Sequence, residues 1–88
     1  MSEVEVTPAA GGEGWRVVVL PEGTEHEVAV PGGMAARLGF GDDERALVEA
    51  SFAFLLDREP ASAILRRFSL EVIGRYFPEY ESVVGGGR

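Results

Sequence analysis

Breaker-rich segments divide the first thirty residues into strand-length pieces, and this division constrains the fold more than any other feature of the chain. Val4 and Val6 alternate with acidic residues, which is the period of a half-buried strand. The segment PAAGGEG at 8–14 then interrupts the pattern with glycines and a proline. The next piece, WRVVVL at 15–20, is apolar on both faces and is typical of a central strand or one covered by a second layer.

A second breaker cluster and a third alternating piece complete this region. Pro-Glu-Gly at 21–23 is a turn signal, because proline presets φ and glycine accepts a positive φ. The segment EHEVAV at 25–30 again alternates. Three strands joined by short breaker segments predict an antiparallel meander.

The middle of the chain has helical period instead. Pro31 ends the third strand, and we expect a short helix from Met34 to Leu38 that Gly39 stops. Asp42 is a good N-cap for a longer helix that runs to about Arg58, with further acidic residues in its first turn. Apolar residues recur along that stretch at helical spacing.

Two more helices are expected after the break at Pro60. One runs from Pro60 through Arg67, and a last one covers Leu70–Phe77, with Ser69 as its cap and Pro78 at its end. The order of strands and helices predicts an α+β fold, with a three-stranded antiparallel meander followed by three to four helices packed on one face. We expect a single domain over 1–84 and a disordered tail at 85–88.

Composition and charge narrow the class of protein. With 88 residues the chain forms one domain with a thin margin of stability, and its acidic N-terminus and short apolar runs predict a cytoplasmic protein without a membrane span. The chain contains no Cys and no Lys, and its net charge is −7. Residues 1–30 hold six Glu and one Arg, whereas residues 61–88 hold three Glu and four Arg. An acidic chain does not attract nucleic-acid phosphates, so nucleic acid is an unfavoured partner.

No common catalytic or metal-binding pattern is present. His26 is the single histidine, and its neighbours Glu25 and Glu27 point to the opposite face of the strand, so we expect a histidine beside the core or on the surface. The acidic run at 42–44 fits helix capping better than cation binding. We therefore expect no enzyme activity, no cofactor and no metal site.

The C-terminal block ILRRFSLEVIGRYFPEY at 64–80 is the candidate interaction surface. It is the only part of the chain that is not acidic, and it carries apolar stripes at helical spacing together with residue types that are enriched at interfaces. Burial in the domain's own core is the competing interpretation for most of these residues. The candidate interface residues are Ile64, Arg66, Arg67, Phe68, Ile73, Arg75, Tyr76, Phe77 and Tyr80.

Three resemblances accompany this interpretation. Residues 52–80, with the Glu-Pro break, the ILRxF run and the RYFPEY close, resemble a group of small uncharacterised proteins from high-GC bacteria, a resemblance that implies a domain family but no activity. Residues 26–43, HEVAVPGGMAARLGFGDD, resemble the strand–helix element of AbrB-type swapped-hairpin regulators and antitoxins, which implies DNA binding. The order of elements is similar to PqqD-like modules, which implies capture of a peptide on a sheet edge.

The sequence thus predicts a non-catalytic protein-interaction module or adaptor. We expect it to self-associate or to bind another protein, because a small domain gains stability from association. An AbrB-like DNA-binding regulator and a PqqD-like peptide-recognition module are the alternatives.

Overall fold

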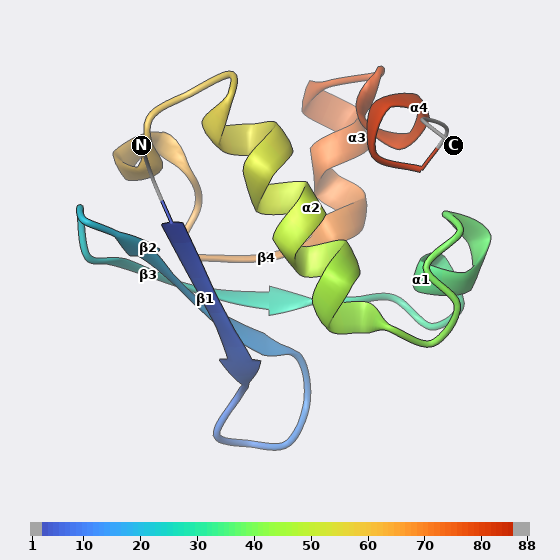
Figure 1. The fold of residues 1–88 in the computed structure, drawn as a ribbon, viewed down its shortest axis with the longest axis horizontal. Coiled ribbons are helices and arrows are strands. Elements are labelled where there is room, and N and C mark those ends of the chain that lie inside the picture. Colours follow the sequence, from blue (N-terminus) through green and yellow to red (C-terminus); the bar gives the residue numbers. More distant parts are fainter. Residues whose placement is uncertain (1–2, 86–88) are drawn as a thin grey trace.

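The computed structural model describes residues 3–85, which form one four-stranded sheet with helices on one of its faces (Figure 1). In chain order the elements are β1 (Glu3–Pro8), β2 (Trp15–Leu20), β3 (Thr24–Ala29), α1 (Met34–Arg37), α2 (Glu44–Leu56), the 3-10 turn η1 (Ala61–Ala63), β4 (Arg67–Ser69), the 3-10 turn η2 (Leu70–Val72), α3 (Ile73–Tyr76) and α4 (Tyr80–Val84). The fold is therefore α+β, as predicted.

The predicted three-stranded meander is confirmed in part, because it makes up three of the four strands of a mixed sheet. β1, β2 and β3 pair antiparallel in sequence order, with Val6 opposite Val17 and Val17 opposite His26. These paired positions point to the covered face, and all three side chains are buried. Alternation places the acidic residues of β1 and β3 on the opposite, uncovered face.

α2 is the central element of the helical layer. It crosses the covered face of the sheet, contacts β1 on one side and contacts α4 on the other (Figure 1). Its N-cap is Asp43 rather than the predicted Asp42, because Asp43 Oδ1 accepts a hydrogen bond from the Ala46 N–H at 3.0 Å. The helix ends at Leu56, close to the predicted end.

The predicted helix from Pro60 through Arg67 is wrong. Only Ala61–Ala63 form a 3-10 turn, after which the chain becomes extended and β4 pairs parallel with β3, Phe68 lying opposite Val28. The Glu27 N–H donates to the Arg66 carbonyl at 2.7 Å. The edge of β3 thus provides the hydrogen-bond partner that the Arg66 carbonyl would have found within its own segment in a helix. The sheet order is β1-β2-β3-β4, with the helices α1 and α2 in the connection from β3 to β4.

The C-terminal segment is partly as predicted. The expected helix over 70–77 consists of η2 and α3 in succession, and the short helix α4 beyond Pro78 was not predicted. Gly85 ends α4, its N–H donating to the Glu81 carbonyl at 2.9 Å. The rest of the expected disordered tail, 86–88, lies outside the described residues.

Candidate partner-binding groove

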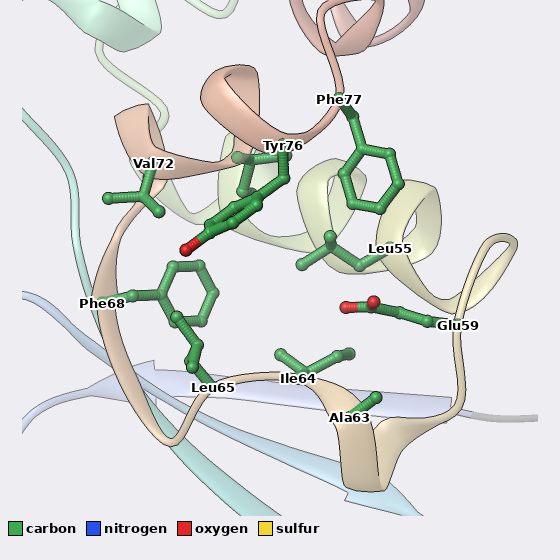
Figure 2. Close-up of a pocket in the computed structure, with 10 residues that line it drawn as sticks. Leu55, Glu59, Ala63, Ile64, Leu65, Phe68, Val72, Tyr76 and Phe77 are labelled. Carbon is green, nitrogen blue, oxygen red and sulfur yellow. The ribbon is translucent and has the colours of Figure 1, made fainter.

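An apolar groove opens beside the C-terminal end of α2, and we treat it as the candidate functional site. Its volume is about 470 Å³, and its walls come from α2, the loop that follows it, the segment leading into β4, and η2 with α3 (Figure 2). The groove is lined by Leu55, Glu59, Ala63, Ile64, Leu65, Phe68, Val72, Ile73, Tyr76 and Phe77.

The groove has a buried floor and an exposed apolar rim. Leu55, Ile64 and Ile73 are almost fully buried and belong to the core. Leu65 and Tyr76 stand at the rim with exposed fractions of 52% and 70%. The two rim residues are the apolar groups that a bound partner would remove from water.

Aromatic packing fixes one wall. Phe77 lies edge-on against Phe54 of α2, with ring centroids 5.7 Å apart. The Arg58 guanidinium sits over the same Phe54 ring, 3.7 Å from its centre. Such contacts add to the burial of apolar area and hold α3 against α2.

His26 holds the opposite wall. Its Nδ1 lies 2.7 Å from the Leu65 carbonyl oxygen and its Nε2 lies 3.0 Å from the Thr24 hydroxyl. Because a carbonyl oxygen only accepts, Nδ1 carries a proton and donates to Leu65, while the Thr24 hydroxyl can either donate to Nε2 or accept from it. The His26 ring also packs on Phe52, which in turn contacts Phe68. His26 is thus buried beside the core, where it positions the segment that forms the groove rim.

Glu59 brings the single charged group among the residues that line the groove. It follows α2, its N–H donating to the Leu55 carbonyl at 2.9 Å. Figure 2 shows its carboxylate directed into the groove, between Leu55 and Ile64. The groove therefore combines an apolar surface with one half-buried anionic group at one end.

The structure brings together five of the nine candidate interface residues in this groove: Ile64, Phe68, Ile73, Tyr76 and Phe77. Of these, Ile64 and Ile73 are core residues that contribute only to the floor. The lining residues that sequence reasoning did not select are Leu55, Glu59, Ala63, Leu65 and Val72. In the sequence, Glu59 stands at the expected end of a helix, next to Pro60. The one local signal for a groove wall is that this break is followed directly by the mostly apolar run at 61–65.

The other four candidates lie elsewhere. Tyr80 is fully buried, so it belongs to the core and not to a surface. Arg66 and Arg67 line a separate polar hollow beside the end of β1, where Arg67 pairs with Glu27 at 3.0 Å. Arg75 is exposed on α3 but does not line the groove.

Tyr80 is part of a buried hydrogen-bond chain behind the groove. Ser51 Oγ donates to the Leu47 carbonyl at 2.7 Å and lies 2.6 Å from the Tyr80 hydroxyl. Because the Ser51 proton is directed to Leu47, the Tyr80 O–H donates to Ser51. Burial raises the pKa of the Tyr80 phenol, since it disfavours the charged phenolate.

Within residues 3–85, no group of three or more His, Asp or Glu side chains is arranged to hold a metal ion. The same residues form no helix that is both long and apolar enough to cross a membrane. Comparison with known proteins finds no matching family model, no matching curated protein and no matching solved structure.

Proposed function

We propose that this protein is a non-catalytic interaction module that binds an apolar side chain of a partner protein in the groove beside α2. The observation that carries the proposal is the concave apolar lining with Leu65 and Tyr76 exposed at its rim. Large apolar side chains that gather around a hollow are typical of a binding site, whereas a single exposed one is ordinary. Tyrosine is also among the residues that most often dominate binding energy.

The size of the groove favours one or two side chains over an extended interface. Its volume of about 470 Å³ lies within the range of about 300–1,000 Å³ that small binding sites occupy. It is about three times a 150 Å³ cavity that accepts a benzene ring. An aromatic or branched aliphatic side chain with part of its neighbour fills such a space.

The chemistry of the lining supports binding over catalysis. Its groups able to exchange a proton are the Glu59 carboxylate and the Tyr76 hydroxyl, and it holds no Ser or His that would form a nucleophile with a base. The His26 ring nitrogens are both engaged in structural hydrogen bonds. These features support an adaptor function.

The open face of the sheet disfavours the DNA-binding alternative. The pairing of the strands places four exposed glutamates on this face: Glu3, Glu5, Glu25 and Glu27. Glu25 and Glu27 pair with Arg16 and Arg67, and the remaining negative charge of the face repels phosphates. The segment at 44–56 is a helix where AbrB-type proteins return to a strand. We therefore do not propose DNA as the partner.

Strand addition at β1 is the second candidate function. β1 is an edge of the sheet among the described residues, so its outer backbone groups can pair with a peptide strand as in the PqqD-like alternative. The same edge suits a second copy less well. Pairing of two β1 strands would bring their Glu3 and Glu5 carboxylates together, and like charges oppose one another across a sheet.

Selection from a displayed library of random twelve-residue peptides tests the proposal. Peptides that bind the purified protein are remeasured by fluorescence anisotropy against Leu65→Ser and Val83→Ser. These substitutions are matched, because Leu65 and Val83 are 52% and 50% exposed and Val83 does not line the groove. We expect the Leu65 variant to bind at least tenfold more weakly and the Val83 variant to bind like the wild type.

Two outcomes would overturn the proposal. One is equal binding by both variants. The other is a set of amide chemical-shift changes on β1 instead of the groove, which would favour strand addition. Sedimentation of the free protein at high micromolar concentration separately tests the predicted self-association. A clean monomer would contradict that prediction.

A further inference from the structure

Glu59 sets the charge that the groove can accept. Its carboxylate points into an otherwise apolar lining (Figure 2). Within residues 3–85 it forms no ion pair and no side-chain hydrogen bond. A carboxylate in apolar surroundings is stabilised by a cation more strongly than one in open solvent, because the local dielectric is lower.

The nearest arginine in sequence is held away from Glu59. Arg58 Nε pairs with Glu79 at 3.2 Å, and the Arg58 guanidinium also covers the Phe54 ring. Its NH1 group donates to the Phe54 carbonyl at 3.3 Å and lies 3.5 Å from Asp57. These contacts hold the Arg58 guanidinium at Phe54, Glu79 and Asp57, and it forms no ion pair with the neighbouring Glu59.

The remaining charge of the chain also favours a basic partner. The net charge of the chain is −7. The two arginines next to the rim residues in sequence, Arg66 and Arg75, do not line the groove. An excess of negative charge steers basic partners toward the protein and weakens the approach of acidic ones.

From these observations we infer that the groove recognises a peptide segment in which an apolar anchor is accompanied by Arg or Lys, with the basic group paired to Glu59. This inference rests on the proposed function. The stem of a basic side chain is itself apolar, so it can lie along Leu65 and Phe68 while its head reaches the carboxylate. Arginine suits the site best, because its planar group binds a carboxylate through two hydrogen bonds and stacks on aromatic rings.

A second copy of the chain fits the groove less well. A stable dimer buries about 800 Å² of each partner, which is about 15% of the 5338 Å² surface of this protein. Interfaces between identical subunits are also rich in apolar residues. Among the described residues only two large exposed apolar side chains, Leu65 and Tyr76, stand at the groove, which matches the anchor of a peptide better than half of a dimer.

The experiment uses the tightest peptide from the display selection. Each basic residue in it is replaced in turn by citrulline, which keeps the shape of arginine and removes its charge, and by glutamate. We expect one position, at a fixed number of residues from the apolar anchor, where the arginine peptide binds about tenfold more tightly than the citrulline peptide. This advantage should shrink as salt is raised from 50 to 500 mM, because ions screen the pair.

Glu59→Gln supplies the decisive comparison, and Glu71→Gln is its control, since Glu71 is exposed and does not line the groove. In Glu59→Gln the arginine advantage should fall below twofold while the citrulline peptide binds as before. In Glu71→Gln the advantage should persist.

The outcomes separate the two proposals. Two results overturn the inference but leave the groove as a binding site. In one, binding requires Leu65 but is no tighter for the arginine peptide than for the citrulline peptide. In the other, the tighter binding of the arginine peptide persists in Glu59→Gln. Binding that is insensitive to Leu65→Ser overturns the proposed function itself. Loss of peptide binding through dimerisation across the groove, seen by sedimentation, would identify a second copy as the occupant and overturn the peptide inference.

Discussion

Replacement of Tyr80 by Phe tests the buried hydrogen-bond chain that supports the groove from behind. The substitution removes one hydroxyl from a fully buried ring and leaves Ser51 Oγ without the bond that it accepts at 2.6 Å. Ser51 still donates to the Leu47 carbonyl, so no strong acceptor is left without a donor. We expect the free energy of unfolding at pH 7 to fall by about 1 kcal/mol, the usual net worth of such a bond.

The same substitution changes how stability depends on pH. The pKa of the Tyr80 phenol is raised in the folded protein, mainly by burial, above its unfolded value of about 10. The folded state therefore holds this proton more tightly, and the stability that it contributes is complete below pH 10 and is lost as the pH rises toward the folded pKa. The Phe variant has no such loss, so the free energies of the two proteins should converge as the pH rises above about 10.

Urea unfolding followed by the fluorescence of Trp15, the single tryptophan, measures both effects. With an expected slope of about 1 kcal/mol per M, the midpoint of the variant at pH 7 should lie about 1 M lower. Tyr76→Phe is the control, because its ring is 70% exposed. A midpoint equal to that of the wild type at pH 7, or parallel stability curves between pH 9 and 11, would refute the reasoning.

Two further substitutions test the walls of the groove and the start of α2. His26→Phe keeps an aromatic ring on β3 but removes the donor to the Leu65 carbonyl, so we expect a loss of about 1–2 kcal/mol in urea unfolding and weaker peptide binding; unchanged binding would show that the rim does not depend on this bond. Asp43→Ala removes the side-chain cap of α2 and should cost about 1 kcal/mol, whereas Asp42→Ala should cost less than about 0.5 kcal/mol by thermal unfolding. The reverse order would place the cap at Asp42.

The local part of the fold was predictable because its signals lie within each segment. The alternation of Val4, Val6 and their neighbours predicted the meander, and the period of 44–56 predicted α2. β4 was not predictable in this way. Its residues have apolar spacing that also fits a helix, and they become a strand only through pairing with β3, a partner about forty residues away.

The candidate site shows the same division. Phe68, Tyr76 and Phe77 were selected from the sequence because large apolar residues in a short chain must be buried or bound. The position of Glu59 at the groove depends on how the loop after α2 meets the segment before β4, and no local pattern encodes that meeting. Arg66 and Arg67 were assigned to the same surface, but strand geometry directs them to a different hollow.

The parallel pairing of β3 with β4 has a consequence for the order of folding. The meander forms from contacts between neighbours in sequence, whereas Glu27 and Arg67 meet only after the whole α1–α2 segment has closed a long loop. The last strand is therefore expected to dock late and to open first, carrying one wall of the groove with it. Occupation of the groove would then slow amide exchange in β4 and at His26, and would tie partner binding to the docking of the last strand.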